Sequence, residues 1–395
     1  MLASRASRLP PLYLLLAVGL ITIFLYYHHG ASSAYKPRFP VANYPTGVAS
    51  ATNATLGFGG LWAVSGPGSP RRNRLEQAAA ATGLELTVPT QPTWSDEDVE
   101  NFKWPNKSES EVTTGTVKAW LSHHVVLKEF LKSGQETALI FEDDIDWDIR
   151  LKSVQVPLAQ RAARSLGKTK SIDSSVYPWG SPKDWDLLYL GHCGDYLNML
   201  TKGVGVGHHH PSDLEKLKHV LYEDPTMLNR TDLHPYTASF LTALTVPEQT
   251  RVFHHSVWPL CTFGYAITRY TAQRLLQDLA PAKEDIKKHI TAYDAAILTA
   301  CRDNHILCYT LQPELFHHME GESLIAGEEK DPVPRPPVDA AGLEQVKWRK
   351  ETSNIGCGFW SGEFYHGGDQ SKLAYVQNEV IAKGQCLKPE PVRET

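Results

Sequence analysis

Apolar residues along this chain form two kinds of pattern, short continuous runs and longer stretches with helical spacing. The runs predict buried strands at 61–65, 138–141, 185–191, 263–268 and 305–311. Apolar positions three or four residues apart predict helices at 73–82, 116–132, 270–279 and 295–302. Gly83 and Gly134 follow two of these helices, where glycine commonly ends a helix. Strands that alternate with helices indicate an α/β domain, whose ligands lie at the carboxyl ends of the strands.

Other regions show no clear pattern. Residues 94–110 are polar and charged and predict a surface loop. The stretch 193–255 and the tail from Lys347 have no clean period, so no element is predicted there. Within the first of these, three glycines precede His208, His209 and His210, and we expect a mobile loop.

The N-terminal stretch has the features of a membrane anchor. Arg5 and Arg8 precede an uncharged apolar run from Leu12 to Tyr27, which is near the lower length limit of a membrane-spanning helix. The positive-inside rule then keeps the N-terminus in the cytosol and places the rest of the chain in the lumen. A signal peptide cut within 31–34 is the alternative. Both interpretations put the chain in the secretory pathway.

The patterns divide the chain into five segments. We expect a cytosolic tail at 1–9, a transmembrane signal anchor at 10–28 and a stem at 29–55, which is rich in Ser, Ala, Pro and Gly. The α/β domain spans 56–327. Residues 328–395 comprise a charged, Pro-rich linker and a C-terminal extension that we expect to pack on the domain.

Charge and covalent chemistry narrow the class of protein. The formal net charge of −5 gives no support for nucleic-acid binding, which requires a basic patch. An even number of cysteines, six, indicates disulfides in an oxidising lumen, and their spacing fits no zinc ribbon. Asn53, Asn106 and Asn229 stand in Asn-x-Ser/Thr sequences, the acceptors of N-glycosylation, which agrees with the same compartment.

One predicted strand ends in an acidic cluster. Four apolar residues lead directly into Glu142-Asp143-Asp144, and Asp146 and Asp148 follow. In a locally extended chain Glu142 and Asp144 point to the same side, and Asp143 points to the other. Hard carboxylate oxygens at a sheet edge select Mg²⁺ or Mn²⁺, and such an ion commonly binds a diphosphate. A solvated acidic turn is the alternative.

The chain also offers the other residue types that such a site needs. Arg71 and Arg74 open a helix after a glycine turn, which suits a phosphate but is also typical of a solvated basic helix end. His317 and His318 are candidates to complete a metal shell, with ordinary core or surface histidines as the alternative. Asp294 is a candidate general base for an acceptor hydroxyl, or else an ordinary helix N-cap. The carboxylates that compete for the role of base are Asp146, Asp148 and Asp195.

These segments, taken in order, resemble glycosyltransferase family 25, which includes bacterial lipooligosaccharide galactosyltransferases and procollagen galactosyltransferases. The resemblance covers about 57–325. It is carried by Leu121-Ser122-His123, Ala138–Asp144, Trp185–Gly191, Gly264–Thr268 with the helix that follows, Asp294, and a closing segment with Pro313, Leu315 and Ser323. The cysteine placement is similar to that of fungal members.

The resemblance implies a GT-A-type, Rossmann-like nucleotide-sugar-binding domain with a mixed, mostly parallel sheet. It implies a UDP-sugar donor, often UDP-galactose, a divalent ion (Mn²⁺ or Mg²⁺), and transfer with inversion to a glycan or glycoprotein acceptor in the Golgi or endoplasmic reticulum. Asp294 would be the catalytic residue. The expected metal ligands are Glu142, Asp144, His317 and His318. The residues expected at the nucleotide-sugar are Val64, Ser65, Arg71, Arg74, Ser122, Glu142 and Asp143.

The chain departs from the family's pattern in several places. The stretch 66–70 lies between the first strand and the arginines, which leaves the nucleotide contacts of Arg71 and Arg74 open. The insertion at 193–255 and the cysteine-bearing tail are not general family features and leave the acceptor open. Six cysteines allow fifteen full pairings. We expect Cys301–Cys308 and Cys193–Cys261, which leaves Cys357–Cys386.

Two other functions fit the same residues. A non-catalytic carbohydrate-binding protein on this fold would stack sugars on aromatic side chains such as Trp258 and Trp360. A metal-dependent hydrolase would use the acidic cluster with His317 and His318. No motif encodes the pocket shape that selects the donor sugar, the acceptor and the linkage.

Overall fold

The computed structural model describes residues 39–44, 52–169, 171–197, 209–319, 354–359 and 364–384. The chain divides into two compact units, 1–38 and 39–395, and the first unit lies wholly outside the described residues. The predicted tail and anchor therefore also lie outside them. No helix among the described residues is long and apolar enough to cross a membrane.

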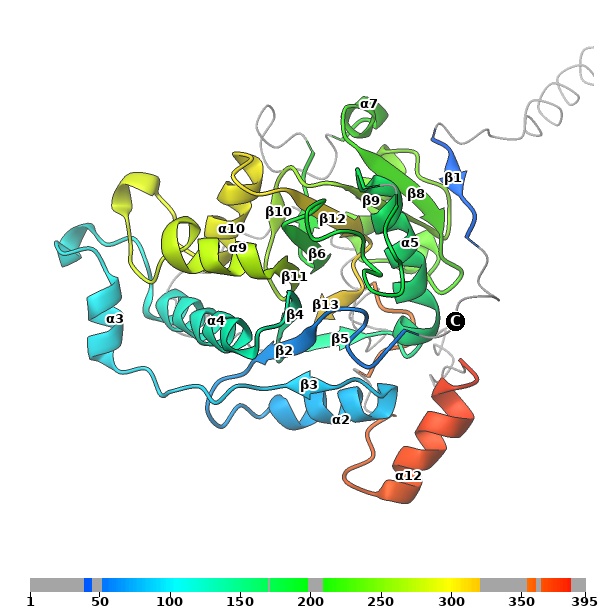
Figure 1. Ribbon diagram of the computed structural model, residues 1–395, viewed down its shortest axis with the longest axis horizontal. Coiled ribbons are helices and arrows are strands. Elements are labelled where there is room, and N and C mark those ends of the chain that lie inside the picture. Colours follow the sequence, from blue (N-terminus) through cyan, green and yellow to red (C-terminus); the bar gives the residue numbers. More distant parts are fainter. Residues whose placement is uncertain are drawn as a thin grey trace, which may run out of the picture. The chain divides into compact units, whose positions relative to one another are not determined.

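A nine-stranded mixed sheet organises the second unit (Figure 1). The order is β1-β8-β9-β12-β6-β11-β4-β2-β3, and the strands all point the same way except β9 and β11, whose pairings are antiparallel. The strands are β1 (Val41–Ala42), β2 (Gly60–Val64), β3 (Leu86–Thr87), β4 (Thr137–Glu142), β6 (Leu187–Gly191), β8 (His219–Glu223), β9 (Thr250–His255), β11 (Gly264–Thr268) and β12 (Cys308–Gln312). The predicted α/β class with a mostly parallel sheet is confirmed.

Two short antiparallel pairs lie outside this sheet. β5 (Ile145–Trp147) pairs with β13 (Phe316–His318), and β7 (Gly194–Asp195) pairs with β10 (Pro259–Leu260). The first pair continues directly from the acidic end of β4, so it brings the end of the folded core beside that cluster.

Helices pack on both faces of the sheet, as alternating strand residues require. On β4, Ala138 and Ile140 face a core that includes α4, α9 and α10, whereas Leu139 and Phe141 face α2 and α5. The helices are α2 (Arg72–Thr82), α3 (Asp96–Phe102), α4 (Thr114–Ser133), α5 (Val156–Leu166), α7 (Pro211–Glu215), α8 (Pro235–Ala243), α9 (Arg269–Arg274), α10 (Tyr293–Arg302) and α12 (Gln370–Tyr375). Short 3₁₀ turns lie at Lys107–Glu109, Arg230–Asp232 and Ile286–Lys288, and π-helical turns at Leu151–Gln155, Leu275–Leu279 and Val376–Ile381.

The predicted helix ends agree with the structure where a glycine follows. Gly83 ends α2 and Gly134 ends α4, both in the left-handed conformation that glycine adopts without steric cost. The predicted helix at 270–279 is divided into α9 and a π-helical turn.

The surface loop predicted at 94–110 is wrong in part, because α3 lies within it. Ser95 accepts a hydrogen bond from the N–H of Asp98, whose carboxylate accepts from the N–H of Ser95 in return. This capping box starts the helix, and Val99 and Phe102 bury its apolar side.

The stretch 193–255, left without prediction, builds one side of the sheet. β8 and β9 pair with each other, and α8 contributes Phe240 and Leu241 to a third apolar cluster. The same cluster contains Phe39, and β1 pairs with β8. Residues 39–44 fall inside the segment predicted as a stem, yet they pack on the domain because Phe39 and β1 find partners there.

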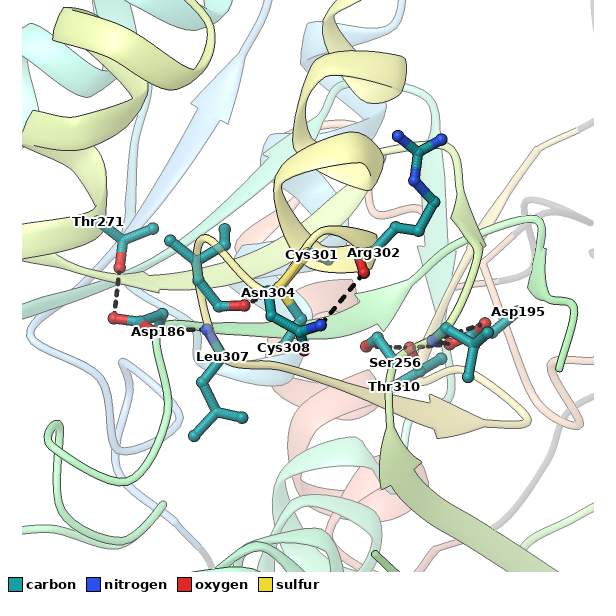
Figure 2. The surroundings of a disulfide bond; sticks show 12 residues. Asp186, Asp195, Ser256, Thr271, Cys301, Arg302, Asn304, Leu307, Cys308 and Thr310 are labelled. Carbon is teal, nitrogen blue, oxygen red and sulfur yellow. Dashed lines mark hydrogen bonds between the residues drawn. A yellow bond between two sulfur atoms is a disulfide. The ribbon is translucent and has the colours of Figure 1, made fainter. Parts of the chain in front are cut away.

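Disulfides fix three places. Cys193–Cys261 and Cys301–Cys308 are bonded as predicted. Cys357 is also disulfide-bonded, and its expected partner Cys386 lies outside the described residues. Figure 2 shows how Cys301–Cys308 joins the last turn of α10 to the start of β12. Beside it, the carboxylate of Asp186 accepts hydrogen bonds from the hydroxyl of Thr271 and the N–H of Leu307, which fixes the same strand start.

Candidate active site

The acidic cluster lies where the carboxyl ends of β2 and β4 meet. Val64, the last residue of β2, stands opposite Glu142, the last residue of β4. Adjacent β6 ends at the same edge, and antiparallel β11 starts there, because Gly264 pairs with both Phe141 and Gly191. In α/β sheets this edge is the usual place for ligands.

Asp143 points back toward β2. Its Oδ2 accepts a hydrogen bond of 2.6 Å from the hydroxyl of Ser65, and Nε of Arg72 donates to the same hydroxyl oxygen at 3.2 Å. Burial raises the pKa of Asp143, and the hydrogen bonds from Ser65 and Ser69 only partly oppose this. Asp143 therefore supports the turn between the two strands, on the side predicted for it.

Asp144 is the most strongly contacted carboxylate of the cluster. Its Oδ2 accepts a hydrogen bond of 2.8 Å from Nη1 of Arg71 and lies 3.1 Å from Nε2 of His318. Burial alone would raise the pKa of Asp144, but His318 and Arg71 outweigh it and lower the pKa. Conversely, burial opposes the charge of His318, yet Asp144 raises the pKa of that imidazole. The second oxygen, Oδ1, is buried and has no hydrogen-bond partner among the described residues.

Glu142 lies at the end of a buried polar relay. Its Oε1 is 3.5 Å from Nε2 of His123 on α4, and Nδ1 of His123 is 3.1 Å from the hydroxyl of Tyr265. That hydroxyl lies 3.1 Å from the hydroxyl of Tyr293, on which the imidazole of His123 stacks. The relay orients the ring of His123 toward Glu142. Only the position of His123 next to Ser122 in the resembling motif pointed to it in the sequence.

The two late histidines have different partners. His317 and His318 are neighbours on β13, so their side chains leave opposite sides of the strand. His318 reaches Asp144, whereas Nδ1 of His317 bonds to the buried carboxylate of Glu314. Burial opposes the charge of Glu314, but His317 and Asn354 outweigh it and hold its pKa at about 2. The structure thus brings His318, and not His317, to the predicted metal residues.

Asp294 lies at the same edge, in the first turn of α10. The residue that caps this helix is Ala292, so the N-cap alternative for Asp294 does not hold. Its Oδ1 accepts from the N–H of Ala295, and it also interacts with the backbone of Cys261, which precedes β11. Burial raises the pKa of Asp294, and the negative charge of Glu142 raises it further. These are the properties of a carboxylate suited to accept a proton.

Two of the predicted nucleotide contacts have other partners. The guanidinium of the exposed Arg74 lies 5.7 Å from the centre of the Tyr365 ring, in the C-terminal segment. The hydroxyl of Ser122 accepts a hydrogen bond of 2.9 Å from the indole of Trp94, and its carbonyl accepts from Gln91. Arg71 and Ser65 remain next to the acidic cluster.

The competing carboxylates are occupied by structural contacts. Asp146 accepts the N–H groups of Trp147 and Phe359, and Asp148 accepts those of Arg150 and Cys357 together with the guanidinium of Arg150. Asp195 accepts from the N–H groups of Val257 and Trp258 and from the hydroxyl of Thr310, as Figure 2 shows in part. Their oxygens already have donors, which leaves Asp294 as the stronger candidate base.

The donor set was tested for its fit to a divalent ion. The described residues contain no group of three or more His, Cys, Asp or Glu side chains placed to hold a metal. Mg²⁺-like ions, however, are commonly held by one or two carboxylates plus substrate phosphates and water. The buried, unpartnered Oδ1 of Asp144 and the partly exposed Glu142 supply such a pair. These residues fit an ion that binds together with a diphosphate.

Comparison with protein families and with curated proteins finds no match to this chain. Any function for this site therefore has to be argued from the fold, the geometry of the cluster and the resemblance of the motifs.

Proposed function

We propose that this protein is a lumenal, metal-dependent glycosyltransferase with a GT-A-type domain, similar to family 25. It would transfer a hexose, with galactose expected, from a UDP-sugar to a glycan or glycoprotein acceptor. The observation that carries the proposal is the meeting, at one sheet edge, of Asp144 with its unpartnered buried oxygen, Glu142, Arg71 and Asp294.

The residues divide the chemistry among them. Asp144 and Glu142 would hold Mn²⁺ or Mg²⁺, which supplies neutralisation of the charge that develops on the leaving diphosphate. Arg71 carries a positive charge beside the same carboxylate and would contact a phosphate once the donor is bound. Ser65 and Asp143 would keep the turn after β2 open to the nucleotide.

Asp294 would act on the acceptor. Its raised pKa fits a base that takes the proton of the acceptor hydroxyl as that oxygen attacks the anomeric carbon. UDP leaves from the opposite face, so the configuration is inverted. The two disulfides support the lumenal setting, because such bonds persist in oxidising compartments.

The experiment that tests this function is UDP release from a panel of UDP-hexoses, with Mn²⁺ and with EDTA. We expect turnover with one UDP-hexose, loss of turnover in EDTA, and loss of turnover in Asp144→Asn. Transfer to an added acceptor distinguishes a transferase from a hydrolase, which would release free hexose from an unactivated glycan or act on a phosphoester. Glycan binding that survives loss of Glu142 and Asp144, without turnover of any UDP-sugar, would replace the proposal with a carbohydrate-binding function.

A further inference from the structure

A groove of about 230 Å³ lies at the amino ends of the strands, at the edge opposite to the candidate active site. Its lining comes from the turn before β2, from the start of β4, from a loop near 175–180 and from the segment before β6. The lining residues are Asn53, Gly57, Phe58, Gly59, Glu136, Thr137, Ser175, Val176, Tyr177, Pro178, Trp179, Gly180, Pro182 and Trp185. The volume is below the range of about 300–1,000 Å³ typical of pockets that enclose a whole ligand. It suits a single ring.

The floor and the open wall of the groove differ in character. Phe58, Trp179 and Trp185 are buried and pack on one another, with the rings of Phe58 and Trp179 stacked at 4.9 Å. Val176 and Tyr177 form the open side, and Val176 is 61% exposed. Ser175, Glu136 and Thr137 add polar groups. Apolar and aromatic surface beside a few polar groups is the mixture that holds a sugar ring.

Asn53 lines this groove and is also an N-glycosylation acceptor. Its side chain is held in one orientation, because Oδ1 accepts hydrogen bonds from the N–H of Gly57 at 2.7 Å and from the hydroxyl of Thr55 at 3.3 Å. The same turn is fixed to the groove, since the carbonyl of Leu56 accepts from the indole of Trp179 at 2.8 Å. Among the described residues no hydrogen bond uses Nδ2, the atom that carries an N-linked sugar.

The other two acceptors differ from Asn53. Asn106 donates from Nδ2 to Glu109 at 2.7 Å, and neither Asn106 nor Asn229 lines this groove. All three are exposed, so each is accessible to modification. Asn53 alone combines a fixed carboxamide with a neighbouring recess.

We propose that Asn53 carries an N-linked glycan and that its first N-acetylglucosamine lies in this groove, against Tyr177. In that reaction the host's transferase forms the bond between Nδ2 and C1 of the sugar. The bond between C1 and the diphosphate of a lipid-linked oligosaccharide breaks, and one Nδ2 proton leaves with the diphosphate. The groove opens away from the acidic cluster, so the glycan leaves the proposed active site free. The inference goes beyond the proposed function and does not depend on it.

The first measurement is glycopeptide mass spectrometry on the full chain expressed in a eukaryotic secretory host. We expect a glycan at Asn53, retained in Thr55→Ser and lost in Thr55→Ala. An unmodified Asn53 in the wild-type chain overturns the proposal.

The second measurement is the rate at which a peptide N-glycosidase releases this glycan. Contact with the groove should slow release from the native protein about tenfold relative to the denatured chain, which corresponds to ~1.4 kcal/mol. Tyr177→Ala should restore much of the rate, whereas Tyr375→Ala, which removes an exposed tyrosine on α12, should leave it unchanged. Equal rates from native and denatured protein would show that the glycan projects into solvent, against the proposal.

Discussion

The run from Glu142 to Asp148 contains carboxylates in two different settings. The first three stand at the sheet edge, where Asp144 leaves a buried oxygen without a partner among the described residues. Asp146 and Asp148, a few residues later, are also buried but accept several hydrogen bonds each. Some of those donors come from the C-terminal segment, which includes Cys357 and Phe359.

The difference shows how burial alone misleads. A buried carboxylate that has its full set of donors holds the fold together, whereas one with an unmet oxygen is prepared for a ligand. Here the distinction is made by a segment more than two hundred residues away in sequence. Glu314 belongs with the structural carboxylates, because it accepts from Asn354 of the same C-terminal segment as well as from His317.

Asp144→Asn should have the largest effect on function. Removal of the charge that would hold the ion should lower UDP release about 10³-fold, which corresponds to several kcal/mol of transition-state stabilisation. The melting temperature should change little, because Oδ1 makes no hydrogen bond with the described residues. Asp146→Asn is the matched control and should show the reverse, a lower melting temperature with turnover retained. If both variants lose turnover equally at unchanged stability, the two settings are not distinct.

Asp148→Ala should have the largest effect on stability. It leaves the guanidinium of Arg150 without the carboxylate that binds it through two contacts of 2.7 Å. Loss of one partner of a buried pair costs about 3–5 kcal/mol. Urea denaturation measures this, and Arg150→Met combined with Asp148→Ala should recover part of the loss, because no unpaired charge then remains. A loss below the value for an average surface substitution would place Asp148 with the functional carboxylates.

Glu314→Gln should weaken the protein in a pH-dependent way. Its pKa of about 2 in the folded state lies below its ordinary value of 4.5, so its carboxylate stabilises the fold above about pH 4.5. That stabilisation is lost as the pH falls toward 2, and it amounts to about 3 kcal/mol at neutral pH. Denaturation free energies measured from pH 2 to 7 should fall steeply on the acid side in the wild type and less steeply in the variant. Identical slopes would contradict the role given to Glu314.

Gly358→Ala tests how closely the C-terminal segment approaches Asp146. A Cβ at this position would lie 2.1 Å from Oδ2 of Asp146, which no real contact allows. We expect a loss of about 1–3 kcal/mol, the range for overpacked interiors, measured by thermal or urea denaturation. Gly66→Ala is the control, since a Cβ there meets nothing within 4 Å. Asp146→Ala should suppress part of the effect of Gly358→Ala, and strict additivity would argue against the contact.

The sequence predicted the elements whose signals are local. Gly83 and Gly134 marked two helix ends, and continuous apolar runs marked the central strands. α3 was missed although Ser95 and Asp98 already form its capping box, a signal that needs no tertiary context. β8 and β9 could not be found in this way, because each depends on the other and on β1 rather than on its own apolar pattern.

The candidate site was predictable to the same degree. Alternation along the strand correctly separated Asp143 from Asp144, and the order of the strands then placed Ser65 beside Asp143. The choice between His317 and His318 depends on how β13 is registered against β5, which the sequence does not reveal. The contacts of Asp146 and Asp148 depend on residues 357–359, where no pattern predicted an element.

The smallest effect concerns the relay behind Glu142. Tyr265→Phe removes the hydroxyl that lies between His123 and Tyr293, so the imidazole that faces Glu142 loses its orientation. Loss of such an outer partner typically weakens metal binding about 10-fold to 100-fold. We expect the apparent KM for Mn²⁺ to rise about tenfold while kcat at saturating Mn²⁺ changes less. Tyr189→Phe is the matched control, because its buried hydroxyl has no hydrogen-bond partner among the described residues. Equal effects of the two substitutions would mean that the tyrosines serve packing alone, and Glu142 would then have no support of its own, in contrast to Asp146 and Asp148.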